Sequence, residues 1–369
     1  MVRKRRARQA CAGRRGSICR GSPLAAILVF CTSGVTPMIN PSDFDGTRIL
    51  VGDVGGTHAR FAIVEVSARG PWRIGREKVL DQGFPTFSAA LRSYFEAIGA
   101  DQMPPIAAIA VAGPVTRGTA RFTNRQWQIS EKELVAFGFK HALLINDFAA
   151  LAFAIPILEK KDLRPVGPEL EVPELSTVTI LGAGTGFGVS CLARYGDQEV
   201  PMATEGGHIG FAPSDAAESA VLDTLRKQFG RVSVERILSG PGLESVYRTL
   251  EQLSGRVPAP LAAAEIVARA SGQDAGCRTA FTLFCAVFGS GAGDFALAHG
   301  ARGGVYLAGG VVQRNEALLQ QSPFRARFES KGRLSPYVAA IPTKLIVQPE
   351  AAFLGAARAG VLLARRGGC

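Results

Sequence analysis

A strand–glycine turn–strand motif that occurs twice places the strongest constraint on the fold of this chain. Residues 48–66 read RILVGDVGGTHARFAIVEV, with an apolar run before Gly55-Gly56 and a β-branched, aromatic run after it. Such runs favour strands, and paired glycines permit a tight reversal with positive φ. Residues 177–192 (TVTILGAGTGFGVSCL) repeat the pattern. The repeat predicts two related α/β domains that face one another.

The turn of the first motif combines one carboxylate, Asp53, with one hydroxyl, Thr57. Backbone without side chains beside these groups suits a phosphate that carries a metal ion, although an ordinary hairpin would contain the same glycine pair. Two other kinds of phosphate-binding motif, the dinucleotide-binding GxGxxG loop and the Walker P-loop, are excluded. GAGTGFG has Phe187 where GxGxxG needs its third glycine and continues into a strand, and no GxxxxGK[ST] occurs. Phosphate binding would therefore use hairpin turns.

Charge is concentrated at the amino terminus. The 369 residues, 47% hydrophobic and 20% charged, suffice for about two domains with hydrophobic cores. The net charge is +11, of which residues 1–37 carry +8, as Lys4 and seven arginines without any acid. The rest of the chain carries only +3, which argues against a nucleic-acid-binding surface.

Residues 1–45 form a basic extension that we exclude from the fold as disordered or as a misassigned start. Its basic beginning and short apolar run at 23–35 resemble a signal peptide, and its lack of acids also suits a targeting presequence. The third interpretation, which we favour, is that the protein starts at Met38. The apolar run is too short for a transmembrane helix, which needs about 20 residues. Seven cysteines without CxxC spacing fit a reducing compartment, so we expect a cytoplasmic protein without a membrane partner.

Strands and helices alternate along the rest of the chain, which predicts an α/β fold. Beyond the two motifs, we expect strands at 72–82, 106–112, 141–145 and 304–308, and a strand pair at 338–348. We expect helices at 86–98, 130–137, 148–155, 216–229, 262–270, 277–298 and 351–364. We interpret 117–130 as a loop or hairpin, 160–173 as a connector and 201–211 as a glycine-rich loop.

Six motifs in a fixed order resemble the bacterial glucokinase family. They are GDVGGT (52–57), LINDF (144–148), GAGTGFG (182–188), EGGH (205–208), RILSGPGLE (236–244) and LAGG (307–310). Each is weak alone, but together they are specific. The resemblance covers about 47–360 and implies the fold of the hexokinase–actin–Hsp70 superfamily, with two actin-like (ribonuclease H-like) α/β domains flanking a nucleotide and sugar cleft. The implied small domain is 46–155 plus 350–366, and the large domain is 156–349.

The resemblance also implies an ATP-dependent glucose kinase that is a homodimer and uses ATP and Mg²⁺. It implies that glucose is bound by Asn146, Asp147, Glu205, His208 and Glu235. The implied nucleotide contacts come from the two hairpins and a turn against the adenosine: Gly52, Asp53, Val54, Gly55, Gly56, Thr57, Gly184, Thr185, Gly186, Gly309 and Gly310. Asp53 would hold Mg²⁺, directly or through water.

The chemistry of these residues agrees with that implication. A hexose is a ring of hydroxyls, so its site needs several carboxylates and amides. Asn146-Asp147 follows a buried strand at a β–α junction, where ligands bind in α/β sheets. Phosphoryl transfer needs mostly positioning, charge neutralisation and a base near the attacking hydroxyl. We expect Asp147 to be the base that takes the proton of the sugar 6-hydroxyl.

Several alternatives stay open at this point. Asn146-Asp147 could be a helix cap, and Glu205 with His208 could form a turn with a surface histidine. Trp127 with Asn124 either lines the sugar cleft or is a buried aromatic. A related family of repressor–kinase proteins places zinc beside a comparable histidine, but its cysteine-rich loop is missing here, so we expect no zinc. A kinase for another hexose, or a sugar sensor without turnover, would share most of these motifs.

Overall fold

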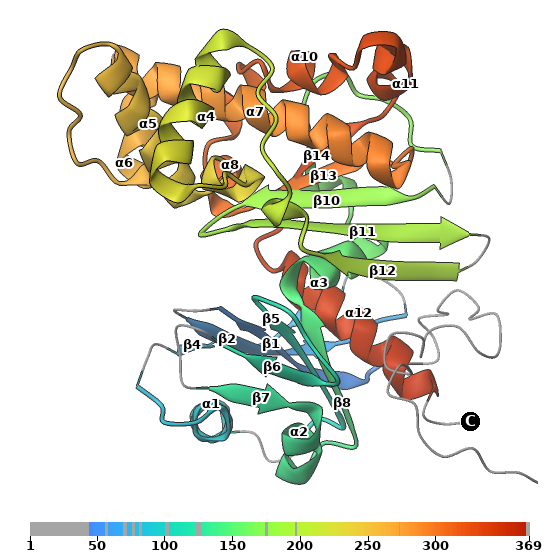
Figure 1. Cartoon of the computed structure of the whole chain (residues 1–369). Coiled ribbons are helices and arrows are strands. Elements are labelled where there is room, and N and C mark those ends of the chain that lie inside the picture. Colours follow the sequence, from blue (N-terminus) through green and yellow to red (C-terminus); the bar gives the residue numbers. More distant parts are fainter. Residues whose placement is uncertain are drawn as a thin grey trace, which may run out of the picture. The chain divides into compact units, whose positions relative to one another are not determined.

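The computed structural model contains two six-stranded sheets that share the order of five strands (Figure 1). It describes residues 44–366 except for 56–57, 69–71, 76–77, 81–82, 100–102, 123–126, 174–175, 196–197 and 273. Nearly all of the basic extension, and with it Met38, lies outside the described residues, as do Gly56, Thr57 and Asn124. The expectations for these positions stay predictions.

The first sheet is built around the N-terminal motif. Its strands are β1 (Arg48–Val54), β2 (Ala59–Glu65), β3 (Arg73–Ile74), β4 (Lys78–Leu80), β5 (Ile106–Val111) and β8 (His141–Asn146). Strands β1 and β2 form an antiparallel hairpin, and β5 and β8 continue the sheet in parallel with β1. Because β3 and β4 each pair separately with β2, the single strand predicted at 72–82 was wrong.

The second sheet repeats this arrangement around the second motif. Its strands are β9 (Leu163–Pro165), β10 (Val178–Ala183), β11 (Phe187–Tyr195), β12 (Gln198–Thr204), β13 (Val305–Ala308) and β14 (Thr343–Ile346). Strands β10, β11 and β12 form an antiparallel meander, and β13 and β14 continue it in parallel. The order β12-β11-β10-β13-β14 matches β3-β2-β1-β5-β8 in the first sheet. The hairpin repeat therefore reflects a repeat of the sheet.

Three predictions for the second sheet were wrong, and each of them concerns one of its two edge strands, β9 and β12, which carry proline. The segment 338–348 contains only β14, whose antiparallel neighbour is β9, inside the predicted connector at 160–173. The predicted loop at 201–211 begins as the end of β12. Pro165 and Pro201 mark these two strands as loops in the sequence. Both strands lie at sheet edges, however, where the missing N–H of proline costs no ladder hydrogen bond.

The seven helices predicted above lie close to their predicted positions, whereas the four short helices between residues 310 and 339 were not predicted, and the last of them overlaps the segment predicted as a strand pair. The helices are α1 (Phe87–Ile98), α2 (Glu131–Phe137), α3 (Asp147–Ala154), α4 (Ala216–Phe229), α5 (Gly240–Leu253), α6 (Ala263–Ala270), α7 (Ala275–His299), α8 (Gly310–Gln313), α9 (Glu316–Gln320), α10 (Phe324–Glu329), α11 (Ser335–Ala339) and α12 (Ala351–Arg366). Ser130 caps α2 by accepting a hydrogen bond from Glu133 N. The segment predicted at 117–130 is a hairpin of β6 (Thr119–Arg121) and β7 (Gln128–Ser130).

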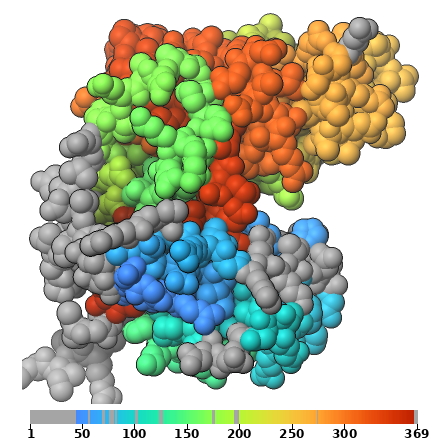
Figure 2. Space-filling model, turned by 180° about the vertical axis from the view of Figure 1, so that it is seen from behind, coloured from blue at the N-terminus to red at the C-terminus, as the bar shows by residue number. Residues whose placement is uncertain are grey.

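The last helix completes the first sheet. Helix α12 packs against α3, β1 and β5, and buries Phe353, Ala357 and Val361 there. The red C-terminal segment abuts the blue atoms of the N-terminal strands in the space-filling view (Figure 2). Gly355 permits the close approach of α12 to α3, because a Cβ at this position would collide with the backbone of Ala150.

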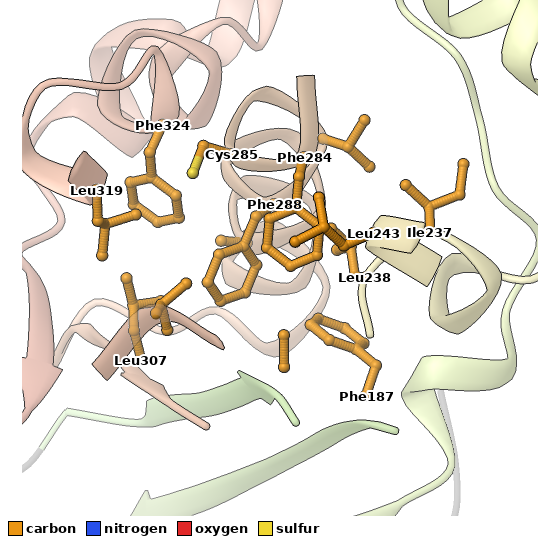
Figure 3. Close-up of a cluster of buried hydrophobic side chains, with 14 of the residues drawn as sticks. Phe187, Ile237, Leu238, Leu243, Phe284, Cys285, Phe288, Leu307, Leu319 and Phe324 are labelled. Atoms are coloured by element: carbon orange, nitrogen blue, oxygen red, sulfur yellow. The ribbon is translucent and has the colours of Figure 1, made fainter. Parts of the chain in front are cut away.

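The largest core surrounds α7. Phe284 and Phe288 of this helix pack with Phe187 of β11 and Phe324 of α10 (Figure 3). Helix α7 is long and apolar enough to cross a membrane, but 72% of its most apolar window is buried by the rest of the chain. Its apolar composition is therefore explained by its position in a protein core.

Candidate functional site

The first hairpin carries a paired carboxylate at its mouth. Asp53 Oδ2 accepts hydrogen bonds from Arg60 Nη2 at 2.6 Å and Nε at 3.2 Å, and the Asp53 side chain is 27% exposed. The Arg60 guanidinium lies 5.0 Å from the centroid of the Phe353 ring. Gly55 N donates to His58 O at 2.9 Å and closes the turn. We did not predict Arg60, although the strand register that pairs Val54 with Ala59 also places Arg60 directly opposite Asp53.

The β8–α3 junction places Asn146 and Asp147 at one end of the first sheet. Asn146 Oδ1 accepts from Phe148 N at 3.0 Å and from Ala149 N at 3.1 Å, so this side chain caps α3. Its Nδ2 donates to Gly113 O at 3.3 Å. Asp147 is the first residue of α3, and its Oδ1 accepts from Phe148 N at 2.9 Å. Asn146 is therefore the helix cap that was considered as an alternative, and Asp147 is the first residue of the helix.

The carboxyl of Asp147 has a raised pKa. Burial raises the pKa of its carboxyl to about 7, although a hydrogen bond from Phe148 N opposes the rise, and the negative charges of Asp53 and Glu205 add to it. Asp53 of the first hairpin and Glu205 of the EGGH loop therefore each lie within electrostatic reach of Asp147. A carboxyl with a pKa near 7 can accept a proton at neutral pH.

The second hairpin is shaped by close backbone contacts. Gly184 N donates to Gly186 O at 2.9 Å to form the turn, and the intervening Thr185 is exposed. A Cβ at Gly182 would lie 2.5 Å from Ala308 O, and one at Gly188 would collide with the ring of Phe148. Glycine is therefore required at both positions by packing, since the neighbouring strand and α3 occupy the space of a side chain.

The EGGH loop lies directly on β11. It comprises Glu205 and the 3-10 turn η4 (Gly206–His208), and a Cβ at Gly207 would collide with Phe187 O. The side chains of Glu205 and His208 are 63% and 59% exposed, with 3.9 Å between Oε2 and Nε2. Two glycines thus fix the loop against the sheet, and the two polar side chains beside them remain accessible to a ligand.

Glu235 contacts the second hairpin. It lies in the 3-10 turn η5 (Val234–Arg236), and its Oε2 accepts a hydrogen bond from Phe187 N at 2.9 Å. A cavity of about 290 Å³ adjoins the same hairpin, and we did not predict most of its lining. The lining residues are Thr185, Gln228, Phe229, Glu235, Arg236, Ser239, Pro241, Gly242, Glu244, Ser245 and Arg248.

Two further predicted positions have packing roles. Gly309 has a φ of 91°, and a Cβ there would collide with Ala183 O, so the β13–α8 turn crosses the base of the second hairpin. Gly309 and Gly310 are not among the residues that line the cavity. Trp127 is buried against Phe87 and donates from Nε1 to Phe84 O at 2.9 Å. It is the buried aromatic of the two alternatives.

Two sheets that share the order of five strands, each with a glycine hairpin that contacts or carries a carboxylate (Asp53 in the first, Glu235 in the second), have the architecture of the actin-like fold. A glucokinase crystal structure from an Antarctic psychrotroph has a TM-score of 0.77 and 35% identity, and the match covers 85% of this chain and 98% of that one. A glucokinase of the ROK family from Streptomyces griseus, in complex with glucose and AMPPNP, shares the fold with a TM-score of 0.58 and 17% identity, over 86% of this chain and 99% of that one.

Sequence comparison identifies the family. The sequence model of the Glucokinase family matches residues 50–362. The glucokinase of Caulobacter sp. (strain K31) is 47% identical over 309 residues, which cover 84% of this chain and 93% of the relative. The chain belongs to the glucokinase family, as the six motifs indicate.

Proposed function

We propose that the protein transfers the γ-phosphoryl group of ATP to the 6-hydroxyl of glucose, giving glucose 6-phosphate and ADP. Membership in the glucokinase family supports this reaction. The observation that carries the proposal is the position of Asp147. Its carboxyl lies at the β8–α3 junction within electrostatic reach of Asp53 on the first hairpin and Glu205 on the EGGH loop, with a pKa of about 7.

Asp147 is the proposed general base. As the sugar O6 attacks, the bond from O6 to the γ-phosphorus forms and the bond from that phosphorus to the β,γ-bridging oxygen breaks. Asp147 accepts the O6 proton, and ADP leaves with the bond's electron pair. The raised pKa supports this role, because a base with a pKa near the working pH combines adequate basicity with a substantial ionised fraction.

The remaining proposed sugar ligands differ in their availability. The exposed side chains of Glu205 and His208 support direct contacts with sugar hydroxyls. The side-chain oxygen of Asn146 accepts the hydrogen bonds that cap α3. Its amide nitrogen Nδ2 is therefore the group proposed to contact the sugar. Glu235 engages Oε2 with Phe187 N, so Oε1 is the oxygen proposed to accept from a hydroxyl.

The nucleotide is proposed to span the second hairpin. The cavity beside Thr185 supports binding of the nucleoside, since its lining combines an aromatic ring with several hydrogen-bonding side chains. Residues 184–186 and 52–57 would then contact the phosphates from two sides. The predicted contact of Gly309 and Gly310 with adenosine stays a prediction.

Mg²⁺ is proposed to accompany the ATP, and the residues present fit this ion. Mg²⁺ usually binds one or two carboxylates together with water and substrate phosphates, so a complete protein cage is unnecessary. No cluster of three or more metal ligands occurs within the described residues, but Asp53 supplies one carboxylate at the first hairpin. When bound, the ion would neutralise phosphate charge, and Asp53 would hold it directly or through water.

The finer organisation of the protein is also proposed. We assign 46–155 plus 350–366 to a small domain and 156–349 to a large domain, which the packing of α12 on the first sheet supports.

The free, buried thiols of Cys191, Cys277 and Cys285 support a reducing compartment such as the cytoplasm. The family resemblance supports a homodimer, which light scattering of the purified protein would test.

A coupled assay with ATP, Mg²⁺ and a panel of hexoses tests the proposed reaction. We expect turnover with glucose at a kcat/KM above that for its epimers. If another hexose had a higher kcat/KM than glucose, that hexose would be the substrate instead. Tight glucose binding without turnover of any hexose would instead identify a sugar sensor.

A further inference from the structure

Glu235 holds the second hairpin through its side chain. Its Oε2 accepts from Phe187 N at 2.9 Å, and a Cβ on Gly186 would lie 2.6 Å from the same oxygen. The carboxylate therefore occupies the space that the missing side chain of Gly186 leaves beside the turn. A hydrogen bond to an ionised acceptor is stronger than one between neutral groups, so this contact can set the position of the turn.

The segment that carries Glu235 contacts the hairpin a second time. Gly240 N donates to Gly184 O at 2.8 Å, on the other side of Thr185. Ser239 fixes the spacing between the two contacts, because its Oγ donates to Glu235 O at 2.8 Å and accepts from Gly242 N at 3.0 Å. Residues 235–240 thus hold the turn at both sides of its exposed threonine.

The same segment is bonded to the EGGH loop on its other side. Val234 N donates to Ile209 O at 3.0 Å, and Phe211 N donates to Val232 O at 3.1 Å. Arg231 Nη2 donates to His208 O at 2.7 Å. Residues 231–234 therefore follow the backbone of the loop that carries Glu205 and His208, and the chain continues from there directly into Glu235.

We propose that Glu235 is a positioning residue that couples the EGGH loop to the second hairpin, so that glucose strengthens the binding of ATP. The inference rests on the proposed phosphorylation of glucose. A sugar that engages the loop and Glu235 Oε1 restricts the carboxylate to the position in which Oε2 holds Phe187 N. Coupling between two binding sites is reciprocal and is typically 5- to 150-fold in affinity. We expect about tenfold here.

Calorimetric titration with AMPPNP and Mg²⁺, with and without saturating glucose, measures this coupling directly. In the wild type, glucose should increase the AMPPNP affinity about tenfold. Glu235→Ala should reduce the increase to less than about twofold, and should raise the KM for ATP in glucose turnover. Glu235→Gln keeps an amide oxygen that can accept from Phe187 N, so most of the coupling should return. An unchanged glucose effect in Glu235→Ala would overturn the proposal.

A double-mutant cycle on the hairpin separates positioning from direct sugar binding. Gly186→Ala places a methyl group against Glu235 Oε2, the end of a flexible side chain, so it displaces the carboxylate without a backbone collision. Its effect on AMPPNP affinity should disappear in a Glu235→Ala background. Gly184→Ala is the matched control, because its Cβ meets no atom within 4 Å. Whatever its own effect, it should add to that of Glu235→Ala.

The outcomes of these experiments remain distinguishable from failure of the proposed reaction. A wild type that turns over glucose but shows additive Gly186→Ala and Glu235→Ala effects would refute the coupling alone. A wild type without turnover would refute the reaction. If circular dichroism shows that Glu235→Ala does not fold, Gly186→Ala alone keeps the test decisive, because displacing the carboxylate should reduce the effect of glucose on AMPPNP affinity, whereas Gly184→Ala should leave that effect unchanged; equal glucose effects in the two variants would overturn the proposal.

Discussion

The two hairpins have the same topology, but they obtain their chemistry in different ways. The first carries a charge of its own, because Asp53 lies on β1 and is held by Arg60 across the strand pair. The second carries no ionisable side chain in residues 182–188 and receives its carboxylate from Glu235. Its shape is instead set by backbone contacts at Gly182 and Gly188. A repeated strand pattern thus preserves geometry while the source of charge changes.

The substitution of Asp147, at the end of the sheet that carries the first hairpin, tests whether its carboxyl takes part in the reaction. Asp147→Asn removes the proposed base and leaves both hairpins intact, so kcat should fall by about 10²- to 10⁴-fold. The coupled assay measures the loss, and glucose binding by calorimetry should change much less. Near-normal turnover would assign the proton transfer to another group.

Gly52 and Gly182 occupy the same position in the two motifs and test the role of backbone shape. In Gly182→Ala the new Cβ meets Ala308 O at 2.5 Å, and backbone cannot move away without disturbing β13. In Gly52→Ala it meets only side-chain atoms, Ile109 Cδ1 at 2.9 Å and Phe61 Cε1 at 3.1 Å, which can shift at smaller cost than backbone. We expect losses in the free energy of unfolding of about 3 and about 1 kcal/mol, respectively. Urea denaturation measures the free energy of unfolding of both variants. Equal losses would show that the two glycines do not differ in their packing roles.

Asp53 tests whether the first hairpin holds the metal. Asp53→Asn should raise the Mg²⁺ concentration needed for half-maximal activity by about 10- to 100-fold. Glu205→Gln is the matched control, since it also removes a negative charge near Asp147 but lies outside the hairpin. Identical magnesium titrations of the wild type and Asp53→Asn would exclude this role.

The pH profile should show the smallest effect. Burial, and then the charges of Asp53 and Glu205, raise the pKa of Asp147 to about 7. A base acts when ionised, so kcat/KM for glucose should fall below about pH 7, approaching tenfold per unit. Glu205→Gln removes a like charge, so it should move this acid limb to lower pH. If the acid limb of the pH profile does not move in Glu205→Gln, the charge of Glu205 does not affect the pKa of Asp147.

Most of the fold was predictable because the second hairpin repeats a pattern already visible in the first. The edge strand β9 was not, since Leu163–Pro165 is too short for periodicity and is defined by its pairing with β14. The positions of the site residues followed from their motifs, whereas the contacts of their side chains did not. Nothing in the sequence joins Glu235 to Phe187 N, a contact across 48 residues that exists only once the second core has formed.

The packing of α12 has a consequence for how the protein is made. A ribosome delivers β1 and β2 early, but the helix that covers Ile49 and Val51 arrives only with residues 351–366. Until residues 351–366 have emerged, this apolar face of the first sheet is covered only in part, by side chains of α3 such as Phe153. Nascent chains of this protein should depend on chaperones, and loss of the last helix should damage the half of the molecule that was synthesised first.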